Sequence, residues 1–375
     1  MMACGTVLGI AGIDLVLPAI PGLPEALGGT PATAQLVLAA YVAGTAIGLL
    51  VFGELGARFS YRPLLGMSLM VFSLLSVTAS FAPSIAELIA LRFVQGAAGA
   101  APAVFAPGVI RALFTQTKAI NRMGLLGSIE SLVPAFAPAA GTWLLWVSDW
   151  RASFLVTGGM AAGLALLFVV IHRKLPEIAK PSMSEGYMSL LRNWAFLQYA
   201  LSQACTLGGL LVFVFGAPVI IISAMAGTLA DFITMQIVGI AFFIAGANVS
   251  GFLAAQFQAP RVIMGGSLLS AFGLAGILLY ALIGGANPFM LAILSIPMNL
   301  GLGFRGPTGF MQAIVASKGN DARGSAVVIL AILLITGVGT AIAAPWITMG
   351  LIPLAAIATA ISISSVLILL PKVIS

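Results

Sequence analysis

The chain has 375 residues, of which 61% are hydrophobic and 7% charged, and its net charge is +6 at pH 7. Soluble domains carry roughly 25% charged residues, so this composition excludes a soluble globular protein and predicts a polytopic membrane protein. The basic residues are scattered between apolar runs, which indicates membrane topology and argues against binding to nucleic acid. Two cysteines and one histidine predict neither a disulfide framework nor a metal site.

Charges, prolines and glycine clusters divide the chain into twelve apolar runs, each near the ~20 residues that a helix needs to cross a bilayer. The runs fall at about residues 3–20, 34–57, 63–82, 85–113, 119–146, 151–172, 194–224, 229–257, 262–283, 288–316, 322–348 and 351–371. We therefore expect an all-α polytopic membrane protein with twelve transmembrane helices.

Lysine and arginine residues predict the orientation of these spans. With the N-terminus inside, all of them lie in inner loops or at inner helix ends, except Arg151 in an outer loop and Arg92 and Arg305 within spans. Positive charge is enriched on the cytoplasmic side of membrane proteins. We therefore expect a multi-pass protein of the cell (inner) membrane with both termini in the cytoplasm.

A polar stretch between the sixth and seventh runs divides the chain into two halves of six spans. The expected domains are an N-terminal half at residues 1–172, a cytoplasmic linker at 173–193 and a C-terminal half at 194–375. Two parallel six-helix repeats are a known way to build a transporter around a site near the bilayer midplane.

Short sequence echoes support this duplication. "GELGARF" (53–59) follows the second span and "GFLAAQF" (251–257) follows the eighth, and both read Gly-x-Leu-x-Ala-x-Phe. "KAINRMG" (118–124) is likewise echoed by "KGNDARG" (318–324) at the equivalent place in the second half. We therefore expect two pseudo-symmetric six-helix halves.

Five stretches together resemble the motifs of one transporter family. They are "IDLVLPAIP" (13–21) in the first span, "GELGARFSYRPLL" (53–65) between the second and third, "LRFVQGAAGA" (91–100) in the fourth, "PAFAPAAG" (134–141) in the fifth and "DWRASF" (149–154) before the sixth. In these stretches the chain resembles the major facilitator superfamily, and its N-terminal half resembles the twelve-helix drug/proton antiporter branch.

This resemblance implies secondary active transport by alternating access, most simply the proton-coupled export of amphipathic drugs or related small molecules. The loop motif between the second and third spans implies a gating role for Gly53, Arg58 and Arg62. The fifth-span motif implies that Pro134, Pro138 and Gly141 form a pivot and a proton seal.

The loop motif departs from the family pattern. Ala57 stands where an acid normally precedes the first arginine, and Ser60 and Tyr61 replace the usual glycine and arginine. The acid normally helps to lock the cytoplasmic side, and Glu54 is the candidate to compensate for its loss. In the fifth span, Ala137 and Thr142 replace glycines of the motif.

Four charged residues fall inside the predicted spans, namely Asp14, Arg92, Glu130 and Arg305. A charge near the bilayer centre costs about 2.5–3.5 kcal/mol on insertion scales, so such residues usually face the bundle interior and mark ion or substrate paths. A carboxyl group held away from water favours its protonated form, and a nearby arginine opposes this. Asp14, Glu130 and Arg92 are therefore the predicted proton-coupling residues.

The estimated depth of each charged residue in the membrane predicts which of them lie at the same level. A rise of ~1.5 Å per residue places Asp14 roughly 9 Å and Arg92 roughly 12 Å from the outer side, so we expect the two near one another, in direct contact or through water. Glu130 and Arg305 both lie roughly 16 Å from the inner side, so they are predicted to form a charge pair between the halves. The alternative for Asp14 and Arg92 is a purely structural pair.

Polar and aromatic side chains within the spans are candidates for the substrate cavity. Tyr41, Gln95, Gln203 and Asn299 are the predicted cavity residues, because binding pockets are mainly apolar with a few placed polar groups. For Gln95, a hydrogen bond to a neighbouring helix is the equal alternative.

Other functions remain open from sequence alone. The chain is a candidate facilitator or proton symporter of a metabolite or lipid, because the fold alone does not select among these. A channel is less consistent with duplicated halves. A membrane enzyme lacks support, because no nucleophile–base pair or cofactor motif is present. Beyond protons, no cofactor is expected, and the expected partners are the bilayer and a small amphipathic substrate, with the monomer as the functional form.

Overall fold

The structure is a computed structural model that describes residues 1–172 and 186–374. In these residues every regular element is a helix, and twelve helical segments are long and apolar enough to cross a membrane. They are Met2–Leu27, Pro31–Arg58, Tyr61–Ser80, Ile85–Leu113, Gln116–Val147, Trp150–Ile171, Trp194–Ser223, Leu229–Phe257, Ala259–Leu282, Pro288–Ala316, Asp321–Met349 and Leu351–Leu370. The predicted all-α fold with twelve spans is confirmed, and each predicted run overlaps one of these segments.

Three of the spans are built from more than one helix. The first is α1 (Met2–Asp14), a 3-10 helix (Leu17–Gly22) and α2 (Leu23–Leu27), and the fourth is α5 (Ile85–Gly99) and α6 (Ala101–Leu113). The eleventh is α14 (Asp321–Ala343) followed by a second 3-10 helix (Ala344–Met349). The α-helical pattern of the first span ends directly after Asp14, where Pro18 and Pro21 lack the backbone N–H that a continuous helix needs.

The remaining spans are single helices. They are α3 (Pro31–Arg58), α4 (Tyr61–Ser80), α7 (Gln116–Val147), α8 (Trp150–Ile171), α10 (Trp194–Ser223), α11 (Leu229–Phe257), α12 (Ala259–Leu282), α13 (Pro288–Ala316) and α15 (Leu351–Ile374). Of the predicted linker 173–193, residues 173–185 lie outside the described part, and Gly186–Arg192 forms the short helix α9.

Polar residues begin several of these helices. Asn193 accepts a backbone hydrogen bond from Phe196 at the start of α10. At the start of α11, the Asp231 carboxylate accepts from the backbone N–H of Thr228 at 2.7 Å and from its hydroxyl at 2.8 Å. These side chains satisfy backbone groups that the first helical turn leaves free.

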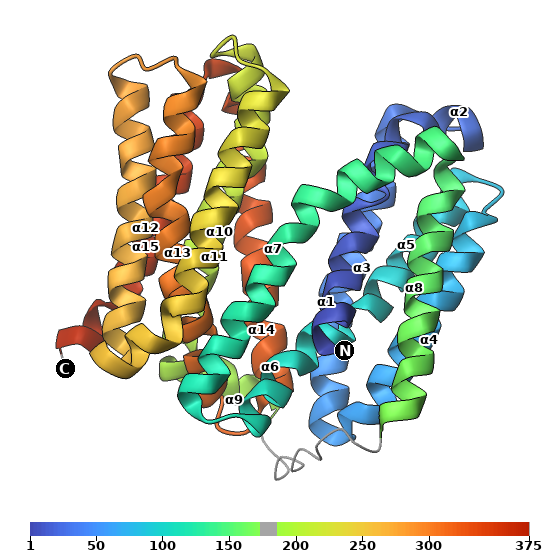
Figure 1. Ribbon diagram of the computed structural model, residues 1–375, viewed down its shortest axis with the longest axis horizontal. Coiled ribbons are helices and arrows are strands. Elements are labelled where there is room, and N and C mark those ends of the chain that lie inside the picture. Colours follow the sequence, from blue (N-terminus) through green and yellow to red (C-terminus); the bar gives the residue numbers. More distant parts are fainter. Residues whose placement is uncertain (173–185, 375) are drawn as a thin grey trace. The chain divides into compact units, whose positions relative to one another are not determined.

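The helices form two compact units, each with its own core (Figure 1). Unit 1 comprises residues 1–113, 129–186 and 320–326, and unit 2 comprises 114–128, 187–319 and 327–375. The boundaries therefore fall inside α7 and inside α14, so the first turns of each of these helices pack in a different unit from the rest. The predicted division at 172 and 194 stays a prediction.

Small residues let the helices of each unit approach closely. In unit 1, a Cβ on Gly96 of α5 would lie 2.1 Å from the Tyr41 carbonyl of α3, and one on Gly44 of α3 would lie 1.8 Å from the Phe93 carbonyl of α5. Both glycines are therefore required for this helix pair. Such small-residue contacts are typical of membrane helices, whose association depends on close packing.

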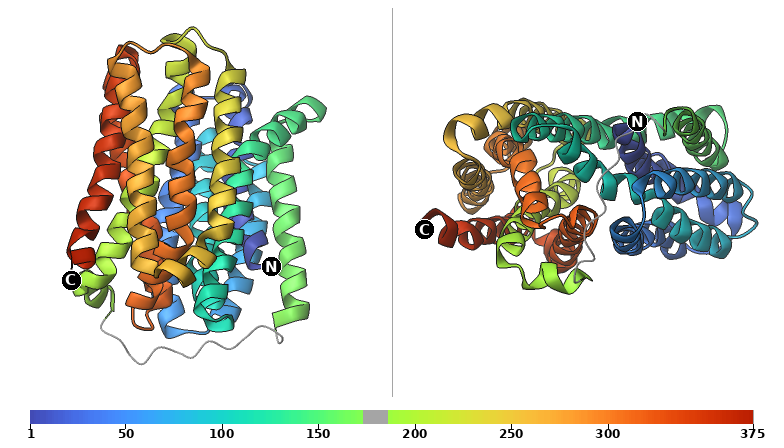
Figure 2. Two further views of the ribbon diagram at one scale, coloured as in Figure 1. Left: turned by 60° about the vertical axis from the view of Figure 1, so that its left-hand side comes forward. Right: turned by 90° about the horizontal axis from the view of Figure 1, so that it is seen from below.

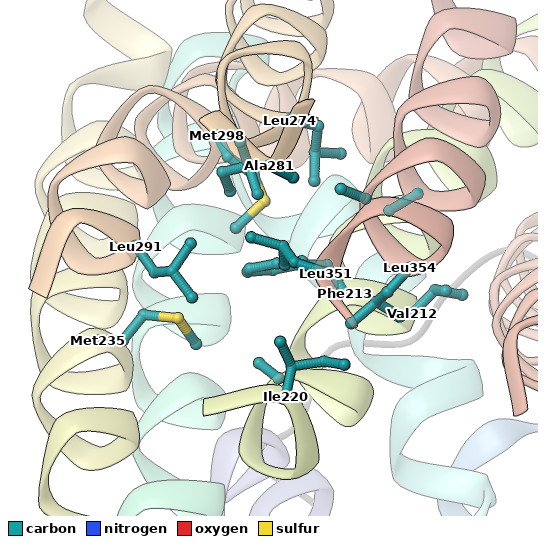
Figure 3. Close-up of a cluster of buried hydrophobic side chains, with 14 of the residues drawn as sticks. Val212, Phe213, Ile220, Met235, Leu274, Ala281, Leu291, Met298, Leu351 and Leu354 are labelled. Atoms are coloured by element: carbon teal, nitrogen blue, oxygen red, sulfur yellow. The ribbon is translucent and has the colours of Figure 1, made fainter. Parts of the chain in front are cut away.

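An apolar cluster in unit 2 is shared by six helices, and the second 3-10 helix packs against it. Phe213 and Ile220 of α10, Met298 of α13 and Leu354 of α15 are each at most 2% exposed within it. Figure 3 shows these side chains converging from their separate helices. Within the same unit, α12 and α15 run side by side (Figure 2).

Candidate functional site

A buried polar cluster surrounds Arg92 of α5, which is 0% exposed. Its Nη1 donates to Oε1 of Gln95 at 2.8 Å, and its Nε donates to the Val37 carbonyl of α3 at 3.5 Å. The Gln95 amide nitrogen donates to Ser76 Oγ of α4 at 2.6 Å. The guanidinium also lies 4.1 Å from the centre of the Tyr41 ring, a cation–π distance. Side chains and backbone of three helices therefore fix this arginine.

Tyr41 connects this cluster to the first span. Its hydroxyl donates to the Gly9 carbonyl of α1 at 2.7 Å, and a Cβ on Gly12 would lie 2.6 Å from the same oxygen. Tyr41 is also close enough to Arg92 and Asp14 for electrostatic interaction with both charges. Of the two predicted cavity residues in unit 1, Tyr41 is thus engaged by α1 and Arg92, and Gln95 by Arg92 and Ser76.

Asp14 ends α1 immediately before the break in the first span. The residue is half-buried, and its Oδ2 is shielded from solvent without a hydrogen-bond partner. The direct contact with Arg92 that depth suggested is not formed, because the Arg92 guanidinium is held by Gln95 and stacks on Tyr41.

The second predicted acid, Glu130, lies on α7 and is half-buried. Its carboxyl group is within hydrogen-bonding reach of the Thr6 hydroxyl of α1. Arg305 belongs to the other unit, so the predicted Glu130–Arg305 pair stays a prediction.

The proline motif of α7 lies against the break after Asp14. Pro134 and Pro138 are both inside the helix, and a Cβ on Gly141 would lie 2.3 Å from the Leu15 carbonyl. The same carbonyl accepts a hydrogen bond from Ser153 of α8 at 3.1 Å. Gly141 of the predicted pivot therefore packs on Leu15, the residue after the predicted proton-coupling Asp14, where α1, α7 and α8 meet.

The predicted gating residues lie where α3 ends and α4 begins. Gly53 is buried in α3, and Arg62 is half-buried in the first turn of α4. Glu54 accepts hydrogen bonds from Arg58 Nε at 2.7 Å and from Arg323 of α14, whose Nε and Nη2 lie at 2.8 and 3.1 Å. Glu54 thus supplies a carboxylate near the position where Ala57 replaces the acid of the family motif.

A second ion pair adjoins this one. Arg111 at the end of α6 pairs with Asp321, the first residue of α14. The start of α14 comes very close to glycines of unit 1: a Cβ on Gly56 would lie 3.0 Å from the Ala322 Cβ, and one on Gly108 would lie 3.2 Å from the Asp321 Cβ. We call Glu54, Arg58, Arg111, Asp321 and Arg323 the α14 charge cluster.

Arg305 of α13 is the buried cation of unit 2 and is 0% exposed. Its Nη1 donates to the Ser202 carbonyl at 2.7 Å and to the Thr206 hydroxyl at 2.8 Å, both on α10. Gln203 lies on the same helix and is 4% exposed. The predicted cavity residue Asn299 donates to the Ser295 carbonyl at 2.9 Å within α13 and packs against Gly239 of α11.

Sequence reasoning missed the partners of these charges. Arg111, Asp321 and Arg323 were not among the predicted site residues. Asp321 and Arg323 lie in the segment 318–324, to which the echo of 118–124 had drawn attention. The echo has a structural counterpart, since a Cβ on Gly251 of α11 would lie 2.0 Å from Asn121 Oδ1 of α7. The segment 118–124 therefore packs on the end of α11 that carries 251–257. The segment 318–324 packs, through Ala322, on the end of α3 that carries 53–59.

Comparison with known proteins identifies the family. The family model of the Major Facilitator Superfamily matches residues 2–344, as the five motifs predicted. The chain is 27% identical over 217 residues to a bicyclomycin resistance protein homolog of Haemophilus influenzae, covering 56% of this chain and 54% of that protein. It is 30% identical over 211 residues to a chloramphenicol resistance protein of Pseudomonas aeruginosa, covering 55% of this chain and 50% of that protein. The chain thus matches about half the length of these curated relatives.

Solved structures share the fold over nearly the whole chain. The fucose:proton symporter FucP of E. coli superposes with a TM-score of 0.75 at 17% sequence identity, covering 99% of this chain and 97% of that one. At this identity the likeness concerns the fold alone.

Proposed function

Because the chain belongs to the Major Facilitator Superfamily, a family of multi-pass membrane transporters of small molecules, we propose that it exports amphipathic compounds in exchange for protons by alternating access. The names of the two resistance relatives support export, and so do the antiporter-type residues of α7. Both relatives are matched over about half their length, so substrate and direction belong to the proposal.

One observation carries the proton coupling, namely the carboxyl group of Asp14 at a helix break inside the first span. Its Oδ2 is shielded from water and unpaired, which favours the neutral acid, and in the proposal Arg92, which stacks on Tyr41, opposes this when it comes nearer. A shift of the α1 break relative to Tyr41 would change the balance between these effects. Proton uptake and release would then follow the movement of the first span.

Glu130 is the second candidate for the proton. It shares unit 1 with Asp14 and contacts the same helix, α1, about two turns away at Thr6. In the proposal, its pairing with Arg305 forms in one state of the cycle and breaks in another. Glu130→Gln is therefore expected to reduce proton-coupled export, and Asp14→Asn to abolish it.

Transport in proteoliposomes with an imposed pH gradient tests the proposal. The wild type is expected to expel an amphipathic fluorescent dye when a proton gradient is present and to stop when the gradient is collapsed. The control is Glu25→Gln, which removes an exposed carboxylate of the same span and is expected to leave export unchanged. Export that persists without a gradient would favour a facilitator, and proton-driven uptake would favour a symporter; either result would refute the antiporter.

The finer assignments belong to the same proposal. We expect an inner-membrane protein with both termini in the cytoplasm, active as a monomer, with protons as the only coupling ion and no catalytic activity. In a cysteine-free background, Asp149→Cys is expected to react with an impermeant maleimide added outside intact cells, and Arg192→Cys only after the cells are opened. The reverse labelling pattern would overturn the orientation.

A further inference from the structure

Arg305 is a buried cation whose hydrogen-bonding capacity is only partly used. A guanidinium carries five N–H donors, and here only Nη1 has partners, the Ser202 carbonyl and the Thr206 hydroxyl. Nε and Nη2 are both buried without a hydrogen-bond partner. Unpaired buried donors on a charged group are costly, so a group that accepts from them would be strongly favoured.

A second unpaired polar atom lies beside these donors. Oε1 of Gln203 is buried and has no partner. A Cβ on Gly309 would lie 2.8 Å from Arg305 Nη2 and 3.0 Å from Gln203 Oε1, so both side chains converge on the bare surface of this glycine. The absence of a side chain at residue 309 leaves room for the guanidinium and the Gln203 amide against this face of α13.

Open space adjoins the same helix face one turn earlier. Gly306 is buried, yet a Cβ added there would meet no atom within 4 Å. Among the glycines of the described residues for which this holds, Gly306 is the one classed as buried. Gly306 and Gly309 are three residues apart, so they share one face of α13.

Among the described residues, the charge of Arg305 also has no acidic partner in its own unit. Asp231 is the single described acidic residue of unit 2, and it caps the start of α11 through Thr228. Arg92 in unit 1 also has an unpaired Nη2, but the rings of Tyr41 and Phe154 lie 4.1 and 5.6 Å from its guanidinium and Gln95 accepts from it. The positive charge of Arg305 is therefore uncompensated by the residues around it.

We propose that Arg305 and Gln203 bind a carboxylate or similar anionic group on the transported molecule, and that its apolar body occupies the space beside Gly306. Nε and Nη2 form one edge of the guanidinium, which matches the two oxygens of a carboxylate. The Gln203 amide can turn its NH₂ group toward the same anion. This substrate class rests on the proposed transport function, and it predicts that acidic amphiphiles are preferred over neutral or basic ones.

Three ligands of the same shape test this assignment by calorimetric titration at neutral pH: 2-naphthoate, 2-naphthamide and 2-naphthylmethylammonium. The full chain is placed in nanodiscs of phosphatidylcholine, so that no anionic lipid competes. We expect 2-naphthoate to bind about tenfold more tightly than 2-naphthamide, which corresponds to about 1.4 kcal/mol, and the ammonium to bind most weakly.

Variants then separate charge from shape. Arg305→Gln is expected to abolish the preference for 2-naphthoate, and Arg305→Lys to keep part of it, because lysine retains the charge without the planar fork. Gly306→Leu is expected to weaken the binding of all three ligands equally. The control is Arg192→Gln, which removes an exposed charge of unit 2 and is expected to leave the preference unchanged.

Two results would overturn the assignment: equal binding of the three ligands to the wild type, or an unchanged preference in Arg305→Gln. If Arg305→Gln does not fold, Arg305→Lys and Gly306→Leu still give a decision, since each has its own expected result. These titrations use no proton gradient, so their failure is distinct from a failure of the dye export assay.

Discussion

Neutralising Glu54 should release the start of α14. Glu54→Gln removes the carboxylate that accepts hydrogen bonds from Nε and Nη2 of Arg323. The hydrogen bond from Arg323 to Asn320 remains. Hydrogen bonds to charged groups contribute about 1.5–3 kcal/mol. Because the Glu54 side chain is 30% exposed, solvent screening reduces this to about 1–2 kcal/mol. Local opening of residues 321–326 should therefore become about 5- to 30-fold more frequent.

Hydrogen–deuterium exchange of the backbone amides at the start of α14 measures this opening directly. The matched control is Arg58→Gln, which removes the other partner of Glu54. Its side chain is 67% exposed, so the pair contributes about 0–1 kcal/mol and exchange should change little. Arg323→Gln should resemble Glu54→Gln, and the double variant should add little to either. Equal effects of Glu54→Gln and Arg58→Gln, or additive effects of Glu54→Gln and Arg323→Gln, would refute the reasoning.

Two further substitutions test the junction around the first span. Tyr41→Phe removes the hydroxyl that donates to the Gly9 carbonyl at 2.7 Å, while Arg92 stays stacked on the ring. We expect the free energy of unfolding in a denaturation series to fall by about 1 kcal/mol. No change in stability would contradict this hydrogen bond. Gly141→Ala places a Cβ 2.3 Å from the Leu15 carbonyl and should lower the free energy of unfolding by about 1–3 kcal/mol. Gly159→Ala is the control, because its Cβ meets no atom within 4 Å and stability should not change. Similar melting temperatures for the two variants would refute the close contact.

The fold was predictable because membrane spans obey a length rule that a single sequence reveals. About 20 apolar residues are needed to cross a bilayer, and the interruptions by charges, prolines and glycines separate such runs cleanly. The break after Asp14 was less predictable. Pro18 and Pro21 indicate that a helix is disturbed, but only packing against Gly141 and Ser153 decides where the chain bends.

The charged residues of the spans were predictable, and their partners were not. Depth along a helix says which residues share a level, and it predicted that Asp14 and Arg92 lie near one another. It does not say which way a side chain points, and Arg92 instead contacts Gln95, three residues along its own helix, and the ring of Tyr41. Glu54 and Arg323 are 269 residues apart, a separation at which sequence spacing carries no geometric information.

The distribution of acids between the units suggests how coupling is divided. Every described acidic residue except Asp231 belongs to unit 1, including Asp14 and Glu130, whereas the buried charge of unit 2 is Arg305. The two predicted proton-coupling acids thus share one unit, and Arg305 lies in the other. In the proposed cycle, a proton bound at Asp14 or Glu130 and an anion bound at Arg305 would each remove a buried charge from the span region. Movement through states of different hydration would then cost less when a site is occupied, which is the condition that an exchanger needs to couple two ligands.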